Sequence, residues 1–173
     1  MKELLEWVKD IVIAVVIALI IMAFFKPILI QQDSMQHTFQ PGNYVVTSRQ
    51  AYRFFGEPER GDVIVFKSEL TTETGKDKNL IKRIIGLPGD TIEIVNGYVY
   101  LNGQLLEEDY VAEEAMSGNM DKVTVPEGKL FCMGDNRRVS LDSRSPQVGF
   151  VDQKTIIGKV VLRLYPFNMI KRF

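Results

Sequence analysis

Hydrophobic positions along the chain follow two different patterns, which meet near residue 30. In the first, Ile11 to Phe25 form an unbroken apolar run, and apolar side chains also dominate the flanks at 4–8 and 27–30. The run alone is shorter than the ~20 residues that a helix needs to span a bilayer, but the flanks extend it. The pattern therefore predicts one membrane-spanning helix within residues 1–30.

A cleaved secretory signal would also contain an apolar stretch, together with a basic leader and small residues at the cleavage site. Here the leader carries both charge signs, at Lys2, Glu3, Glu6, Lys9 and Asp10. The apolar run ends in bulky phenylalanines instead of small residues. We therefore expect an uncleaved anchor, whose two leader lysines favour a cytoplasmic amino end.

After residue 30, short β-branched and aromatic runs alternate with proline and glycine. This texture is typical of a mainly β domain built from antiparallel hairpins, here residues 31–173. Asn96-Gly97 is a strong two-residue hairpin signal. Two polar stretches, 71–79 and 107–121, are expected to be solvated loops. The expected strands are 44–48, 62–66, 80–86, 91–95, 98–102, 122–125, 129–133 and 157–165.

Charge and rare residues exclude several kinds of site. The formal net charge is -1, so the chain has no global basic field and nucleic acid is not an expected partner. Cys132 is the single cysteine, which excludes a disulfide or a cysteine zinc site. His37 is the single histidine, which excludes a metal site with two histidines.

Ser34 follows the apolar run closely and is the candidate nucleophile. His37, three residues later, would have to reach the serine hydroxyl within ~3 Å to act as its base, and a turn at this point does not require that the two meet. A lysine with a lowered pKa is the other possible base. Lys82 has the most suitable surroundings, because Leu80 and Ile84 are its same-face neighbours in a strand. An edge lysine that reaches out to solvent is the alternative reading.

The segment 133–144, MGDNRRVSLDSR, places three polar residues at alternate positions. If the segment is extended, Ser140, Asp142 and Arg144 point to one side. Asp142 and Arg144 would then form a charge-assisted pair, and the Ser140 hydroxyl would orient a neighbouring ammonium. A solvated polar loop is the simpler alternative, and the spacing alone does not decide between them.

Together, these motifs resemble the ordered boxes of bacterial type I signal peptidases. The matching segments are Ser34-Met35 with Thr38, GDVIVF at 61–66, KRIIGLPGD at 82–90 and MGDNRRVSLDSR at 133–144. The resemblance covers essentially the whole chain, and the two longest segments are very specific. The single anchor and the closing strand GKVVLRLYPF are similar to the compact form found in Gram-positive bacteria.

The resemblance implies a membrane-bound serine endopeptidase that removes signal peptides from exported preproteins with a Ser-Lys dyad and no cofactor. It implies Ser34 as nucleophile, Lys82 as general base, Ser140 as the serine that orients the lysine, and Asp142 with Arg144 as a structural pair. The implied fold is a β-rich catalytic domain of antiparallel sheets behind one transmembrane helix, with its apolar surface on the membrane. The implied place is the cell membrane, with an extracytoplasmic catalytic domain and export machinery nearby.

The implied substrates are secretory preproteins with small residues, usually alanine, at the position before the cut and two before it. In an extended peptide these two side chains share a face, which suits two shallow apolar pockets.

Two positions depart from the family pattern. His37 stands where the family usually has proline, and we interpret it as variation that changes the rigidity of the turn and not its chemistry. Gln32, two residues before the nucleophile, stands where the family commonly has glycine or serine. We expect the Ser34 backbone N–H to be one oxyanion donor and the Gln32 amide to be a possible second.

Two alternatives stay open. An organelle inner-membrane peptidase would use the same dyad and a similar anchor. A catalytically impaired, membrane-anchored homologue would act as a binding or assembly factor, because fold alone does not establish activity. The endoplasmic-reticulum type has histidine at the lysine position, and Lys82 argues against it.

Overall fold

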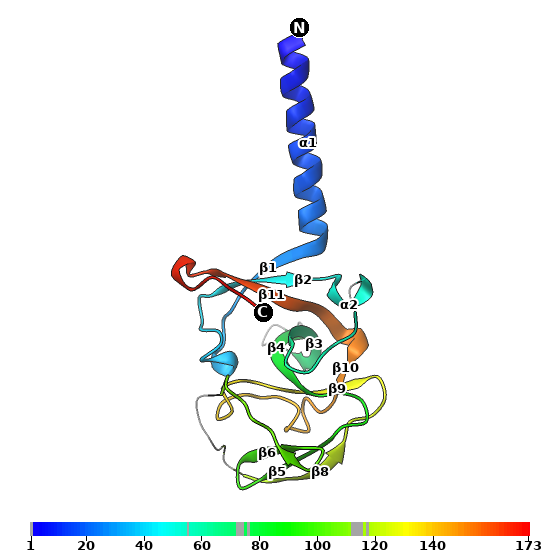
Figure 1. The fold of residues 1–173 in the computed structure, drawn as a ribbon, viewed down its shortest axis with the longest axis vertical. Helices are drawn as coiled ribbons and strands as arrows, with labels where there is room; N and C mark the ends of the chain where they lie inside the picture. Colours follow the sequence, from blue (N-terminus) through cyan, green and yellow to red (C-terminus); the bar gives the residue numbers. More distant parts are fainter. Residues whose placement is uncertain (1, 55, 72–74, 76, 112–115, 117) are drawn as a thin grey trace.

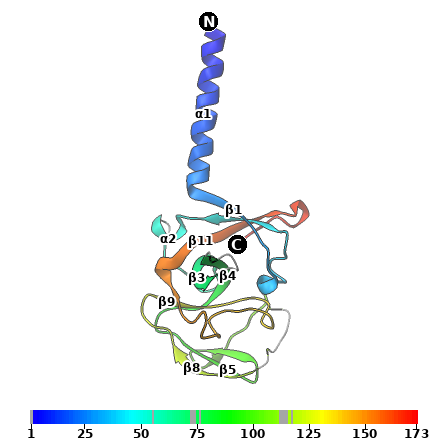
Figure 2. The same ribbon diagram turned by 180° about the vertical axis from the view of Figure 1, so that it is seen from behind.

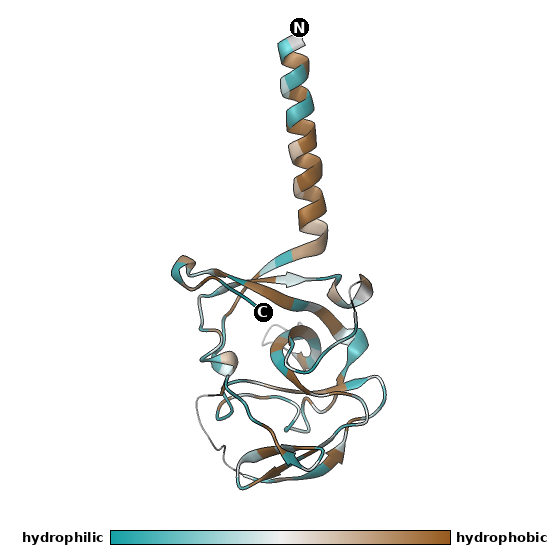
Figure 3. Cartoon of the chain, viewed as in Figure 1, coloured by the Kyte–Doolittle hydropathy of each residue, from teal (hydrophilic) through white to brown (hydrophobic). Residues whose placement is uncertain are grey.

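The computed structural model describes residues 2–54, 56–71, 75, 77–111, 116 and 118–173. One long helix, α1 (Lys2–Phe24), extends away from a β-rich body (Figure 1). The described part of the body does not cover α1, since every side chain described in α1 is exposed. Apolar residues dominate its surface (Figure 3), and within the described residues it is the one helix long and apolar enough to cross a membrane. Exposed apolar surface of this extent requires lipid or a partner to cover it.

The anchor ends earlier than the hydropathy pattern predicts. The apolar flank continues to Ile30, but the chain leaves the helix after Phe24 and forms strand β1 (Phe25–Leu29). Proline cannot continue a helix, and it is tolerated at the edge of a sheet, where β1 lies with Pro27 opposite Val46. The helix is therefore joined directly to the sheet, with no linker between them.

The body consists of two antiparallel sheets. Among the described residues, the larger has eight strands in the order β1-β2-β11-β3-β4-β9-β10, with β12 paired to β11. The smaller has four, in the order β7-β6-β5-β8, and lies at the end of the body away from α1 (Figures 1 and 2). The larger sheet contains β2 (Tyr44–Ser48), β3 (Val63–Thr71), β4 (Asp77–Gly86), β9 (Lys129–Met133), β10 (Val151–Asp152), β11 (Ile156–Tyr165) and β12 (Lys171–Arg172). The smaller contains β5 (Thr91–Val95), β6 (Tyr98–Leu101), β7 (Gln104–Leu105) and β8 (Met120–Thr124).

Strand β3 is buried on both of its faces. Val63 and Val65 pack into one hydrophobic cluster, and the alternate residues Ile64 and Phe66 pack into another. This explains why VIVF is a continuous apolar run and does not alternate with polar residues. Strand β4 pairs along this buried strand and is thereby held in the interior.

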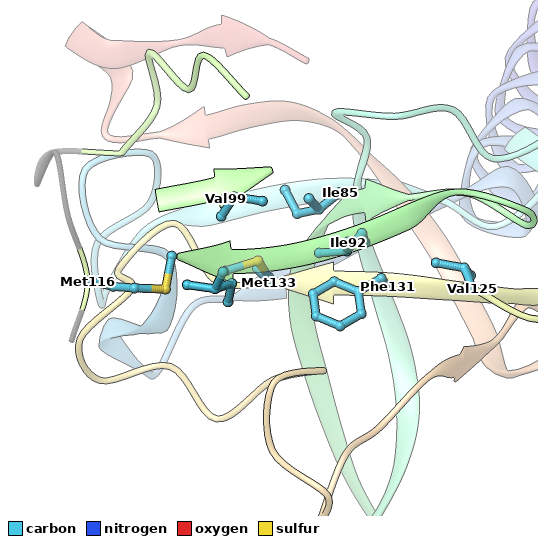
Figure 4. Packing of buried hydrophobic residues seen from close by; sticks show 8 residues of the cluster. Ile85, Ile92, Val99, Met116, Val125, Phe131 and Met133 are labelled. Atoms are coloured by element: carbon cyan, nitrogen blue, oxygen red, sulfur yellow. The ribbon is translucent and has the colours of Figure 1, made fainter. Parts of the chain in front are cut away.

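A third cluster joins the smaller sheet to the larger one. It contains Ile92, Ile94 and Val99 of the smaller sheet with Ile85, Phe131 and Met133 of the larger, and Figure 4 shows these side chains converging between the strands. Asn96 and Gly97 both have positive φ, 52° and 83°, in the hairpin between β5 and β6. The hairpin predicted from these two residues is therefore confirmed.

The mainly β fold and its strands agree with the sequence pattern, with local differences. Strand β3 runs on to Thr71 and β4 begins at Asp77, so the predicted loop 71–79 is shorter, and residues 72–74 and 76 lie outside the described part. Residues 112–115 and 117 of the other expected loop lie outside it as well. Four short helices have no periodic signal of their own: η1 (Asp33–Met35), α2 (Ala51–Phe54), η2 (Gln153–Thr155) and η3 (Phe167–Met169).

The turn after η1 has a backbone conformation that proline cannot adopt. His37 has φ +78°, in the left-handed region, whereas proline is held near ~−65°. The substitution of proline by histidine at this position therefore changes the path of the turn and not only its rigidity. Whether the histidine leaves the chemistry unaltered, as we interpreted it from the sequence, stays a prediction.

We predict that restoring the family's residue harms this protein. His37→Pro should lower the free energy of unfolding by about 2 kcal/mol, because the ring excludes positive φ. His37→Asn should leave stability unchanged, since asparagine tolerates the left-handed region. Thermal unfolding of both variants in detergent measures the difference. Equal stability of the proline variant and the parent would contradict the turn described here.

Candidate functional site

Ser34 lies in η1, a single turn that is pinned to the core by the residues after it. Met35 and Phe39 are fully buried in the cluster around β2, β3 and β11. The Phe39 N–H donates to the Met35 carbonyl at 2.7 Å, and the Gln36 N–H donates to the Asp33 carbonyl at 2.9 Å. Ser34 itself is buried, with 7% of its surface exposed.

Lys82 reaches Ser34 from the middle of β4. Its Cα is paired with that of Ile64, and Leu80 and Ile84 of its own strand pack into the same cluster as Ile64. Lys82 is 1% exposed, which is rare for a lysine. Its Nζ is 2.8 Å from Ser34 Oγ and 2.9 Å from the carbonyl oxygen of Ile81. His37 is exposed, and no hydrogen bond joins it to Ser34 in the described residues.

Burial lowers the pKa of Lys82 from 10.5 to about 8. Desolvation of the ammonium is the largest cause, and the nearby Asp142 carboxylate opposes it. The amine therefore has an accessible neutral form near physiological pH, which an exposed lysine lacks. In this form it can accept a proton from the hydroxyl to which it is hydrogen-bonded.

The loop after β9 closes over the turn that carries the serine. The Asn136 N–H donates to the Ser34 carbonyl at 3.1 Å, and its side-chain amide donates to the Asp33 carbonyl at 3.1 Å. Gly134 lies so close that a Cβ at this position would overlap the Ser34 carbonyl oxygen and the Ser140 side chain. Glycine is thus required for the loop to approach the nucleophile.

Asp142 and Arg144 lie directly behind this loop. Asp142 is fully buried and accepts two hydrogen bonds from Arg144, through Nε and Nη2, each at 2.8 Å. Its carboxylate also accepts the Gly134 N–H at 2.9 Å. Arg144 donates further to the Arg137 carbonyl at 2.9 Å. The pair therefore fixes the loop that holds Ser34, without contacting the hydroxyl itself.

Ser140 does not join the dyad in this structure. Its Oγ is buried and has no hydrogen-bond partner in the described part of the chain, Lys82 included. The sequence argument assumed an extended segment, but 134–150 contains turns and bends and no strand. The alternate spacing therefore does not place the three polar side chains on one face, and turn geometry brings Asp142 and Arg144 together instead.

Gln32 precedes η1 and has extended backbone angles, φ −123° and ψ 157°. Its side chain is exposed and makes no capping hydrogen bond with the turn. No capping hydrogen bond therefore fixes the Gln32 amide next to the turn that carries Ser34.

Sequence reasoning missed a buried ion pair next to the dyad. Arg83 follows Lys82 on β4 and donates to the two Asp135 carboxylate oxygens at 2.9 and 2.6 Å. The Thr38 hydroxyl donates to the same carboxylate. This network links β4, the loop after β9 and the chain beyond η1. Arg83 and Asp135 both lie inside the quoted motifs, but only the pairing of β4 with β9 shows that they meet.

A cleft of about 710 Å³ lies beside the chain segments that precede Ser34 and Lys82. It is lined by the stretch that enters η1, residues 26–32, and by residues 77–81 of β4, with Val65 between them. Its walls therefore consist of the residues that precede Ser34 and Lys82. Within the described residues, no group of three or more histidine, cysteine, aspartate and glutamate side chains could hold a metal ion.

Comparisons with known proteins show the family to which the chain belongs. The family model described as "Signal peptidase, peptidase S26" matches residues 4–165. Signal peptidase I of Bacillus licheniformis is 39% identical over 183 residues, which covers 99% of this chain and 94% of that protein. A probable signal peptidase I-1 of Synechocystis is 41% identical over 165 residues, covering 93% of this chain and 82% of that protein.

A solved structure supports the same assignment. The crystal structure of a signal peptidase I from Enterococcus faecalis is 35% identical in sequence and superposes with a TM-score of 0.51. It covers 61% of this chain and 97% of that chain. The family model and the curated relatives extend over nearly the full length, from the anchor to the closing strand. The chain therefore belongs to the signal peptidase family and is a serine endopeptidase of the type I signal peptidases.

Proposed function

We propose that this signal peptidase cleaves preproteins with Ser34 as nucleophile and Lys82 as general base. The observation that carries the proposal is the 2.8 Å contact between the serine hydroxyl and a buried amine whose pKa is lowered to about 8. A hydroxyl becomes an effective nucleophile when an adjacent base takes its proton, and burial supplies that base here.

The reaction follows from these two groups. Neutral Lys82 takes the proton of Ser34 as Oγ attacks the scissile carbonyl carbon, and an acyl-enzyme forms when the peptide C–N bond breaks. The ammonium of Lys82 returns this proton to the leaving nitrogen. A water molecule then attacks the acyl carbon with Lys82 again as base. The bond between the acyl carbon and Ser34 Oγ breaks, Lys82 returns the proton to Oγ, and the signal peptide leaves with a new carboxylate. The carbonyl of Ile81, 2.9 Å from Nζ, holds the amine in place through both steps.

Donors are required for the oxyanion that develops on the scissile carbonyl. The Ser34 backbone N–H, at the start of η1, serves as one donor in our proposal. The free Gln32 amide, two residues earlier, serves as the second. Ser140 acts as an orienting group only after its buried hydroxyl rotates or shifts toward Lys82, which substrate binding would have to produce. Asp142 and Arg144 act indirectly, by holding the loop against the serine turn.

The cleft on the anchor side fits the signal-peptide end of the substrate. An extended peptide laid along residues 26–32 would present the residue before the cut and the residue two before that one to the same wall, because alternate side chains share a face. Ile28, Ile30 and Ile81 contribute apolar surface there. Small side chains such as alanine match a shallow apolar wall at the position before the cut and two before that one.

The position of the cleft also suits a substrate that emerges from a membrane. Lys26 and Pro27 line it, and they directly follow the membrane-spanning helix candidate. We therefore propose residues 1–30 as a region containing a cytoplasmic end and the anchor, and 31–173 as an extracytoplasmic catalytic domain, with β1 shared between them. The apolar surface of the body would rest on lipid near the export machinery.

Replacing either dyad member should abolish cleavage of a preprotein with an alanine-x-alanine site. Ser34→Ala removes the nucleophile, and Lys82→Met keeps the side-chain volume but cannot accept a proton. We expect each to lower kcat by at least ~10³-fold. Purified full-length protein in detergent is assayed by gel or mass spectrometry, with Lys122→Met as the control lysine.

Full cleavage by Lys82→Met would exclude lysine as the base. A parent enzyme that does not cleave would favour the scaffold alternative, and the same assay run with organelle and bacterial preproteins separates the two peptidase readings.

The pH dependence should follow deprotonation of Lys82. The base is active only when neutral, so log kcat/KM should rise with a slope of one below pH 8 and level off above it. At pH 7 only about a tenth of the enzyme would carry a neutral amine. Initial rates between pH 6 and 10 test this. A profile that is flat across pH 8 would be inconsistent with a lysine base.

Removing the Gln32 amide should weaken transition-state stabilisation. Gln32→Ala is expected to lower kcat about 100-fold with little change in KM, the usual effect of losing one oxyanion donor. Gln31→Ala, the neighbouring exposed glutamine, is the matched control. Unchanged turnover of the Gln32 variant would remove this residue from the oxyanion site.

A further inference from the structure

A second cavity includes residues that follow Ser34 and Lys82 in the chain. It has a volume of about 370 Å³ and is lined by His37, Thr38, Arg83, Asp109, Arg163 and Lys171, among others. We call it the cationic pocket. None of its charged side chains takes part in the mechanism above.

The guanidinium of Arg163 is buried without a carboxylate partner. Arg163 is 7% exposed and donates through Nε to the Met169 carbonyl and through Nη1 to the Thr38 carbonyl, each at 2.7 Å. In the described part of the chain, no carboxylate lies within ion-pair distance of it, and its Nη2 makes no hydrogen bond. Buried charges in proteins are normally paired, so an unpaired one at a cavity wall indicates an anion that arrives from outside.

The other charges on the wall leave the pocket positive. Arg83 is neutralised by Asp135, with which it shares two hydrogen bonds. Lys171 is exposed and lies over the Phe173 ring, 5.5 Å from its centroid, with no carboxylate partner among the described residues. Asp109 contributes one negative charge at the rim. Among the described side chains of the lining, the two cations Arg163 and Lys171 therefore face one carboxylate, that of Asp109.

The chain order of the lining residues shows where the pocket lies along a substrate. The cleft is built from residues that precede Ser34 and Lys82. The cationic pocket includes residues that follow them, His37 and Thr38 after the serine and Arg83 after the lysine, and its other lining residues come from 109–111 and 163–173. A peptide that fills the cleft and crosses the dyad would continue into the pocket. Because the cleft begins at the anchor, the end that enters the pocket is the one beyond the cut.

We propose that the cationic pocket binds an acidic side chain of the mature segment, within the first few residues after the cut. Arg163 and Lys171 pair with its carboxylate, and the enzyme thereby prefers preproteins whose mature end begins with aspartate or glutamate. An extended chain advances ~3.3 Å per residue, so the second to fourth residues after the cut are within reach. This inference rests on the proposed function, since it requires that the cut occurs at Ser34.

An anionic lipid headgroup is the competing occupant, because the pocket includes residues near the carboxyl end of the chain. Substrate is favoured by the wall itself. His37 and Thr38 belong to the nucleophile turn, and Arg83 is the neighbour of the general base. A position next to Ser34 and Lys82 is expected of a site that binds substrate and is not required of a site that binds lipid.

The test is a substrate series cleaved by purified full-length enzyme in neutral detergent. One preprotein carries glutamate, glutamine or lysine, singly, at each of the second to fourth residues after the cut. We expect glutamate to raise kcat/KM about tenfold over glutamine at one of these positions, the contribution of a charge-assisted hydrogen bond. Lysine at that position should be cleaved more slowly than glutamine.

Variants then assign the preference to the pocket. Arg163→Gln should reduce the glutamate-to-glutamine ratio to near one, and Lys171→Gln should lower it about threefold, since an exposed charge contributes less. Lys154→Gln in η2 changes the net charge equally but lies outside both cavities, and it should keep the full ratio. Arg163 also holds two carbonyls, so Lys171→Gln carries the test if the arginine variant does not fold.

The outcomes separate this inference from the proposed function. Cleavage of the glutamine substrate that depends on Ser34 and Lys82 supports the dyad whatever the ratio is. An equal rate for glutamate and glutamine at all three positions overturns the pocket proposal alone. A ratio unchanged in both pocket variants does the same. If the variants alter only binding to phosphatidylglycerol vesicles, the pocket is a lipid site and the proposal is wrong.

Discussion

The contact between Lys82 Nζ and Ser34 Oγ depends on keeping a lysine out of water, and much of the structure serves this constraint. An ammonium loses hydration when it is buried, and this loss lowers its pKa to about 8. The burial requires apolar neighbours on the same face, which β4 supplies through its pairing with the doubly buried strand β3. A strand at the edge of the sheet would leave the same amine hydrated and protonated.

Ser34 lies on a single helical turn, which is not stable by itself. A short helix has too few internal hydrogen bonds to be stable alone. Here Met35 anchors the turn in the core, and the loop after β9 is hydrogen-bonded to its carbonyl groups. The buried pair of Asp142 and Arg144 fixes that loop in turn, and Gly134 allows it to come close enough. Asp142 and Arg144 therefore hold the loop in place and do not contact the Ser34 hydroxyl.

The same arrangement divides the surface around the dyad into two parts of different character. The stretches that enter the serine turn and the lysine position form a partly apolar cleft at the anchor end. A second pocket includes residues that follow them together with Arg163, a buried arginine that makes no ion pair in the described part of the chain. A protease that cuts between a membrane segment and an aqueous segment has one apolar and one polar end of its substrate to bind. The cleft is partly apolar and the pocket is charged, which matches these two ends.

The sequence by itself predicted the long apolar helix, the mainly β fold and the Asn96-Gly97 hairpin, and it singled out Ser34 and Lys82, whose side chains lie 2.8 Å apart, because hydropathy, period and motif are local properties. It did not determine where the helix stops or that His37 has positive φ, since sheet pairing and turn closure decide these. The pair of Asp142 and Arg144 expected from the alternate spacing is present, but the segment folds as turns and Ser140 makes no hydrogen bond with Lys82. Only tertiary structure brought Arg83 to Asp135, and Arg163 to the Thr38 carbonyl, since these contacts join residues 52 and 125 positions apart.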